Sequence, residues 1–161
     1  MNLVSHRGLV SLALGSLLAL SPALALRGAA GSDSPGRADV VAVSASGKPG
    51  SYTFSVTVRS PDRGCEQYAD WWEVLSPGGR LLYRRVLLHS HTDEQPFTRR
   101  GGPVPVQRDE PVIVRAHLNT TGYGGIAFRG SVATGFTAAE VAGDFAAGVE
   151  DEGLQPPRCA F

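Results

Sequence analysis

The stretch Ser51–Arg59, with the sequence SYTFSVTVR, indicates the fold class of this chain. Its apolar and polar residues alternate without a break, and the apolar positions are Tyr52, Phe54, Val56 and Val58. Successive side chains of a β-strand point to opposite faces of a sheet, so one face of this segment is expected in a core and the other in water. The stretch therefore predicts a half-buried β-strand.

Segments on both sides of this strand carry similar signals. Further strands are expected over residues 39–46, 68–75, 80–89, 104–107, 112–118 and 126–132. Turns rich in glycine and proline separate them, among them residues 46–50 and 76–79. Short strands with turn signals about every 8–12 residues are typical of two packed antiparallel sheets. We therefore expect an all-β fold over residues 38–135, an antiparallel sandwich of immunoglobulin or fibronectin type III character.

The first 25 residues have the pattern of a secretory signal peptide. Arg7 precedes an uncharged, largely apolar run over residues 8–20, and the small-x-small sequence Ala23-Leu24-Ala25 follows it. The run is shorter than the roughly 20 residues that a membrane-spanning helix needs. We expect cleavage and a periplasmic or secreted protein. No cysteine follows the site to carry a lipid, which favours a soluble form; a retained membrane anchor is the alternative.

The segments that flank the sandwich are expected to differ from it. Residues 26–37 are small, polar and rich in glycine, and they predict a flexible leader. Residues 136–161 are expected to form a short helix and a tail that packs on the domain. Thr137 and Glu140 have the spacing of a capping box, in which each side chain bonds the backbone amide of the other. This spacing predicts a helix over residues 138–147.

Charge argues against polyanionic partners. The formal net charge is +0 at pH 7, and the arginines are scattered along the chain. A nucleic-acid footprint would need clustered basic residues and a basic balance. We expect no nucleic-acid partner, and no membrane partner once the signal is cleaved.

Cys65 and Cys159 are the only cysteines, and neither belongs to a CxxC pair. In an oxidising compartment the simplest interpretation is one disulfide that joins them, which would pin the tail to the start of the aromatic-rich segment over residues 65–102. A thiolate metal ligand is the alternative for either cysteine.

Three runs resemble a family of uncharacterised exported bacterial proteins. They are CEQYADWWEV from Cys65, LLYRRVLLHSHTDEQPFTR from Leu81 and VRAHLNTTGYGG from Val114, and the similarity extends over residues 39–130. The family has no established activity. The resemblance therefore implies export and a single domain, and it implies no function.

The histidines are the candidate metal ligands. His89 and His91 stand two residues apart, so on an extended strand they project from one face at a spacing that can chelate one metal. If the strands that end at His89 and His117 both run antiparallel to the strand 68–75, all three histidines lie at one end of the sheet. A copper or zinc site is one hypothesis. In the alternative, these histidines only bond the backbone or face solvent.

Patterns of known enzymes do not fit. The segment from His89 to Gly101 is similar to the first cupin metal motif, but it is one residue short and its second half is absent around His117. His91, Asp93 and His117 imitate the facial triad of iron oxygenases, but the domain is too small for that fold. There is no nucleophile elbow, phosphate-binding glycine loop or HExxH motif. We expect no enzyme.

The aromatic residues suggest a different kind of site. Trp71 and Trp72 are adjacent and must face opposite sides of a strand, so Trp71 is expected on the outer face. With Tyr83 and Arg85 it is predicted to form a ligand or partner surface for a protein or a glycan. Alternatively, the tail covers this face. The leading hypothesis is an exported binding or structural module, and the alternative is a copper- or zinc-binding protein.

Overall fold

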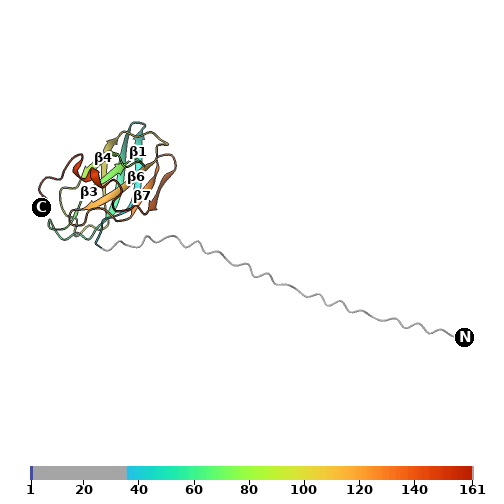
Figure 1. The fold of residues 1–161 in the computed structure, drawn as a ribbon, viewed down its shortest axis with the longest axis horizontal. Helices are drawn as coiled ribbons and strands as arrows, with labels where there is room; N and C mark the ends of the chain where they lie inside the picture. Colours follow the sequence, from blue (N-terminus) through green and yellow to red (C-terminus); the bar gives the residue numbers. More distant parts are fainter. Residues whose placement is uncertain (2–35, 161) are drawn as a thin grey trace. The chain divides into compact units, whose positions relative to one another are not determined.

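Eight strands form two antiparallel sheets in the computed structural model, which describes residue 1 and residues 36–160 (Figure 1). The predicted signal peptide, apart from residue 1, and most of the predicted leader lie outside the described residues. The strands are β1 Asp39–Lys48, β2 Ser51–Arg59, β3 Ala69–Leu75, β4 Leu81–Val86, β5 Phe97–Val104, β6 Val112–Leu118, β7 Ala127–Ser131 and β8 Gly135–Ala139. A short 3-10 helix, η1 Ala147–Asp151, follows them.

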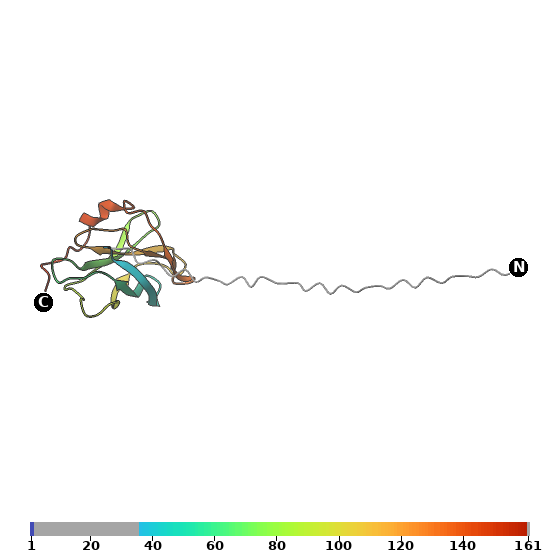
Figure 2. The ribbon, with the colours of Figure 1, turned by 90° about the horizontal axis from the view of Figure 1, so that it is seen from below.

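The sheets stack as two layers. The smaller sheet has the order β1-β2-β5 and the larger one the order β4-β3-β6-β7-β8. Figure 2 shows η1, drawn in red, on the far side of the larger sheet from the cyan strands of the smaller one. The expected all-β class with antiparallel pairing is therefore confirmed. The strand predicted from the alternating stretch at Ser51–Arg59 has the observed bounds of β2.

Two sequence-based expectations about secondary structure are wrong. The fifth strand was expected at 104–107, but β5 ends at Val104. The helix expected over 138–147 does not form, because Thr137 and Ala138 pair with β7 as part of β8. This pairing allows Phe136 to contact Phe54 of the opposite sheet, with 5.6 Å between the ring centroids. Burial against the core thus outweighs a capping box, which is a local preference.

The main core lies between the two sheets around Trp72, which is fully buried. The Trp72 ring meets Tyr83 at 5.7 Å between centroids. Gly101 of β5 lies directly over this pair: a Cβ there would stand 2.7 Å from the Tyr83 hydroxyl and 2.9 Å from the Trp72 ring. Glycine is therefore required where β5 of the smaller sheet approaches β3 and β4 of the larger one.

The outer face of the larger sheet is organised around a buried carboxylate. Glu73 is fully buried, and each of its oxygens accepts hydrogen bonds from a different arginine. Arg84 of β4 donates to Oε2 at 3.0 and 2.9 Å, and Arg115 of β6 donates to Oε1 at 2.8 Å. Because β3 lies between β4 and β6, this one side chain links three neighbouring strands. Paired burial of this kind satisfies charges that could not be buried alone.

The same two arginines hold the C-terminal tail on the sheet. Arg84 donates to the backbone carbonyls of Val149, Glu150 and Glu152, and Arg115 donates to those of Phe145 and Ala146. Beneath them a second apolar cluster forms from strand and tail residues: Leu75, Ile113, Ala127 and Val149, with Leu81, Val141, Phe145 and Ala146 packed against it. The tail therefore covers the outer face, as the alternative interpretation of the aromatic residues required.

A disulfide fastens the end of the tail. Cys65 and Cys159 are bonded with an S–S distance of 2.04 Å, which is the pairing that the sequence predicted. Nearby, the Ala160 amide donates to the Leu88 carbonyl at 2.6 Å. The tail is thus held at its start by arginines and at its end by a covalent bond.

Removing the Glu73 carboxylate is expected to destabilise both the sheet and the tail. Glu73→Ala leaves two arginines buried without their anion, so we expect a loss of about 3–5 kcal/mol in the free energy of unfolding, measured by chemical denaturation. Hydrogen exchange should accelerate most in residues 145–152. Glu94→Ala, which breaks an exposed ion pair, is the control and should change little. Equal stability of the two variants would contradict the central role of Glu73.

Removing the disulfide is expected to act on the unfolded chain. The sequence separation of the two cysteines is 94 residues, so the bond closes a long loop. The double variant Cys65→Ala/Cys159→Ala should lose about 2–4 kcal/mol in chemical denaturation. Wild-type protein unfolded under reducing conditions is the control and should show a similar loss. A double variant as stable as the oxidised protein would contradict this expectation.

Candidate functional site

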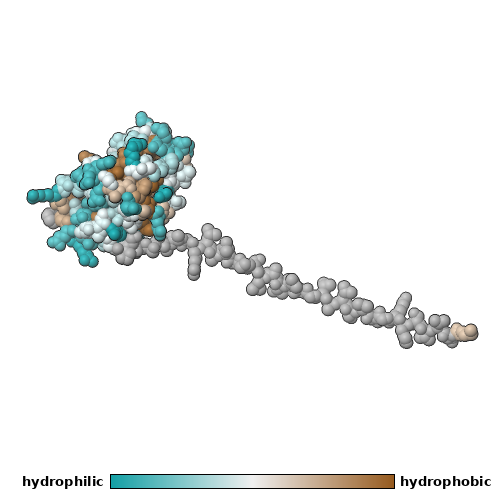
Figure 3. Space-filling view, viewed as in Figure 1, coloured by the Kyte–Doolittle hydropathy of each residue, from teal (hydrophilic) through white to brown (hydrophobic). Residues whose placement is uncertain are grey.

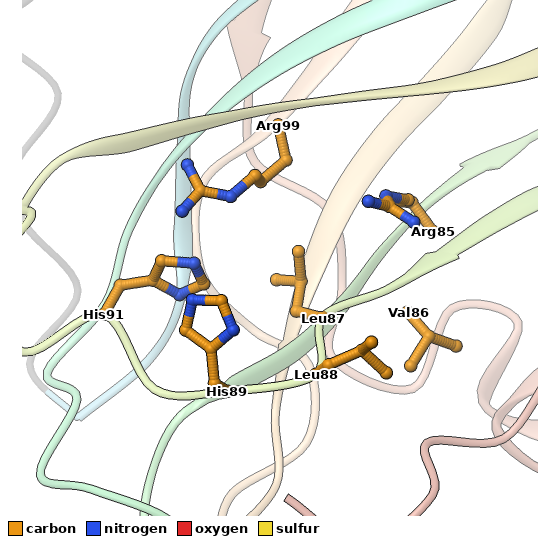
Figure 4. Close-up of a pocket in the computed structure, with 7 residues that line it drawn as sticks. All are labelled: Arg85, Val86, Leu87, Leu88, His89, His91 and Arg99. Carbon is orange, nitrogen blue, oxygen red and sulfur yellow. The ribbon is translucent and has the colours of Figure 1, made fainter. Parts of the chain in front are cut away.

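A small pocket opens at the edge of the sandwich, where the edge strands of the two sheets face each other (Figure 4). It has a volume of about 90 Å³ and is called the edge pocket here. Its lining comes from β4, the segment after β4, and β5: Arg85, Val86, Leu87, Leu88, His89, His91 and Arg99. Both sheets therefore contribute side chains to one site, as is common for ligand sites at junctions between structural elements.

The segment after β4 is held in place by backbone contacts and by Asp62. The Leu87 amide donates to the carbonyl of Asp70 in β3 at 2.8 Å, which continues the pairing of β3 and β4 beyond the end of β4 at Val86. Asp62 then accepts hydrogen bonds from the His91 amide at 2.8 Å and from the Ala69 amide at 3.0 Å. The segment that carries His89 and His91 is therefore held at both ends by hydrogen bonds.

His91 is the most unusual side chain of the pocket. It is only 4% exposed, and its ring stacks on Phe97 with 3.8 Å between centroids. Within the described residues neither of its ring nitrogens has a hydrogen-bond partner, and the nearest carboxylate oxygen, on Asp62, is 3.9 Å from Nδ1. Leaving a buried polar group unsatisfied costs about 1–3 kcal/mol. Such groups are rare in native structures and call for an explanation, of which a functional role is one.

Burial keeps His91 neutral. Desolvation, with smaller contributions from Arg99 and His89, lowers the pKa of His91 to about 4. At neutral pH the ring therefore offers one N–H donor and one acceptor. The exposed ring of His89 lies against it, with 4.5 Å between centroids.

The two arginines of the pocket differ in their pairing. Arg99 donates from both terminal nitrogens to Glu94, at 3.2 and 2.8 Å, and its side chain is 26% exposed. The Arg85 side chain is exposed and forms no hydrogen bond or ion pair with any residue of 36–160. The hollow is therefore bordered by one unpaired guanidinium group and by a second whose only anion is an exposed carboxylate.

The predicted three-histidine metal site is not assembled. His117 lies under the tail instead, stacked on Trp71 at 3.7 Å, and both of its ring nitrogens are engaged, by Asp70 at 2.6 Å and by Glu150 at 3.3 Å. Among the residues that the structure describes, no group of three or more His, Cys, Asp or Glu is placed to hold a metal ion. Around His89 and His91, two guanidinium groups oppose the approach of a cation.

The predicted aromatic surface is also divided. Trp71 is 3% exposed under the tail, and the Arg84 guanidinium lies 4.3 Å from its ring. Tyr83 points to the other face of the sheet, because the register places it opposite Val74 and places Arg84 opposite Glu73. Of the three predicted surface residues, only Arg85 reaches the edge pocket. The sequence-based prediction placed Tyr83 and Arg85 on the outer face with Trp71, but the register places both on the same face as Trp72 and Val74.

Exposed apolar residues agree with this correction. In the described part of the chain the exposed large hydrophobic residues are Met1, Leu88 and Leu154, and none is aromatic. Figure 3 shows hydrophobic residues on one face as a limited band flanked by hydrophilic ones. Leu88 belongs to the edge pocket. Sequence reasoning placed the recognition surface on the strands expected at 68–75 and 80–89 and on the loop over residues 90–102, but it did not single out Arg99 or Leu88. Arg99 was expected in that loop rather than in β5, and Leu88 was expected within a strand over 80–89.

Comparison with known proteins gives one relative. The chain is 42% identical over 101 residues to a protein of the archaeon Halomicrobium mukohataei that bears the name "Putative lipoprotein". The match covers 63% of this chain and 49% of that protein, so the chain spans about half the length of the curated relative. No family model and no solved structure matches the chain. The similarity supports an uncharacterised family, with an archaeal rather than a bacterial relative.

The pKa of His91 predicts how stability depends on pH. The ordinary pKa of histidine is about 6.5, so between about pH 6.5 and 4 the unfolded chain takes up a proton that the folded protein excludes. The contribution of the neutral His91 ring to the free energy of unfolding is therefore fully present above this window, and it is lost as pH falls through it. His91→Phe, which retains a ring against Phe97, should flatten this part of the stability profile in denaturant unfolding. Histidine ring NMR should show a midpoint near pH 4; a midpoint near 6.5 would contradict the assignment.

Proposed function

We propose that the protein is an exported binding module, a sandwich of immunoglobulin or fibronectin type III character, that recognises its ligand through the edge pocket. The observation that carries this proposal is His91, a buried side chain with two unpartnered ring nitrogens at the wall of an open hollow. In a purely structural module nothing would favour keeping such a group there, because phenylalanine could fill the same space without the cost of unsatisfied nitrogens.

Two independent observations support a location outside the cytoplasm. The disulfide that joins Cys65 to Cys159 suits an oxidising environment outside the cytoplasm. A relative that covers part of the chain carries the name of a lipoprotein, a class of exported or membrane-anchored protein. No helix among the described residues is long and apolar enough to cross a membrane. We place the protein in the periplasm or outside the cell.

Binding is favoured over catalysis by the composition of the pocket. Its lining has no serine, cysteine or carboxylate that could act as a nucleophile or a general base, and its buried histidine is stacked rather than hydrogen-bonded to an orienting group. A surface around Trp71 is not proposed, because the tail buries it. The partner, whether a free molecule or a group on a protein or glycan, is expected to enter the edge pocket.

A fragment screen observed by NMR tests this proposal. With ¹⁵N-labelled protein we expect small-molecule hits to shift the resonances of Leu88, His89, His91 and Arg99. Leu88→Trp, at a residue that is 49% exposed, should fill the mouth of the pocket and abolish those shifts. Leu154→Trp, at a residue that is 70% exposed and outside the pocket, is the matched control and should retain them. Hits that map elsewhere, or that survive Leu88→Trp, would refute the pocket as the recognition site.

A further inference from the structure

We infer, building on the proposed function, that the edge pocket binds the oxyanion group of a small organic acid, with the apolar part of the acid lying on Leu87 and Leu88. The oxyanion is a carboxylate or a phosphate, since both present the same charge and the same acceptor geometry to a guanidinium group. Four features of the pocket support this class of ligand over a cation, a sugar or a neutral molecule.

The first feature is that one arginine from each sheet lines the pocket. Arg85 comes from β4 of the larger sheet and Arg99 from β5 of the smaller one. Figure 4 shows the Arg99 guanidinium group on the side of His91 and His89, and Arg85 on the other side of Leu87; all five residues line the same hollow. Arg85 has no anion within residues 36–160. An anionic ligand would supply its missing counter-charge.

The second feature is that the protein already places an oxyanion on Arg99. The Glu94 carboxylate binds it in the two-pronged geometry that arginine also offers to carboxylate or phosphate ligands. The side chain of Glu94 is 59% exposed, so this ion pair is a weak surface contact that a ligand can replace. Hydrogen bonding to Arg99, with smaller contributions from His91 and His89, lowers the pKa of Glu94. Glu94 thus acts as an internal substitute for the ligand.

The third feature is the neutral, unpartnered His91. An N–H donor that is buried and unsatisfied gains a hydrogen bond when an oxygen acceptor arrives, and the neutral ring of His91 has one such donor. His89 lies over this ring and is itself exposed. We expect the His89 side chain to turn aside when the ligand enters.

The fourth feature is the apolar floor. Leu87 is buried and Leu88 is 49% exposed, and both line the pocket beside the arginines. A hydrated inorganic ion would leave this floor unused, whereas a short hydrocarbon chain attached to a carboxylate would cover it. The lining holds no carboxylate or amide to bond sugar hydroxyls and no carboxylate to balance a cation.

The test uses hexanoate, acetate and inorganic phosphate as probes, titrated into the mature protein at constant ionic strength and observed by ¹⁵N NMR. We expect hexanoate to shift the pocket resonances at the lowest concentration. Arg85→Gln should weaken its binding by roughly tenfold, the loss expected for one charged hydrogen bond. Glu94→Gln should strengthen binding, because it frees Arg99. Arg100→Gln, an equal change of charge at an exposed neighbour outside the pocket, should leave binding unchanged.

Opposite effects of Arg85→Gln and Glu94→Gln would not arise from a general loss of structure, so together they support the oxyanion site. Phosphate that binds more tightly than hexanoate, with the same dependence on Arg85, would support an oxyanion site but overturn the organic acid, because the apolar floor would then be unused. Neutral fragments that occupy the pocket equally well in Arg85→Gln would overturn the oxyanion inference and leave the binding module intact. If neither the probes nor the fragments bound in the pocket of any variant, the oxyanion inference and the proposed function would both be overturned. If Arg100→Gln weakened binding as much as Arg85→Gln, the loss of affinity would follow from net charge alone, and this result would overturn the inference.

Discussion

The buried Glu73 carboxylate is the contact on which most of the outer half of the molecule depends. Each oxygen accepts hydrogen bonds from one arginine, and these arginines also donate to five backbone carbonyls of the tail. Without the carboxylate, Arg84 and Arg115 would be like charges buried beside each other. With it, the tail lies flat on the sheet and buries Trp71 and His117. A satisfied ionic network thus decides which surface of the sheet is lost to solvent.

The edge pocket contrasts with this network. Under the tail, polar groups such as the ring nitrogens of His117 find partners within the protein. In the pocket, the ring nitrogens of His91 and the guanidinium group of Arg85 have none within the described residues. Both sites combine arginine, histidine and aromatic rings, so composition alone cannot distinguish them. The two sites differ in whether their polar groups are satisfied within the protein. The tail supplies the partners at the first site, and the second site is open to another molecule.

Much of the scaffold could be predicted because its signals are local or covalent. The alternation along Ser51–Arg59 identified β2, the alternating apolar positions of 112–118 identified β6, and the two cysteines could pair only with each other. Local signals also misled: Thr137 and Glu140 resemble a helix start, but Thr137 and its neighbours pair with β7. A capping preference is a small term, and strand pairing with burial of Phe136 exceeds it.

By itself, the sequence determined the strand-rich class and the disulfide pairing. Only the tertiary structure decided which side chains meet. The register of β3 against β4 sends Tyr83 to the core with Trp72 and Arg84 to Glu73. The fold of the tail hides Trp71 and His117, and the opposition of β4 and β5 brings Arg85 to the same hollow as Arg99. Register and sheet stacking join residues far apart in the chain, and alternation within one strand carries no information about them.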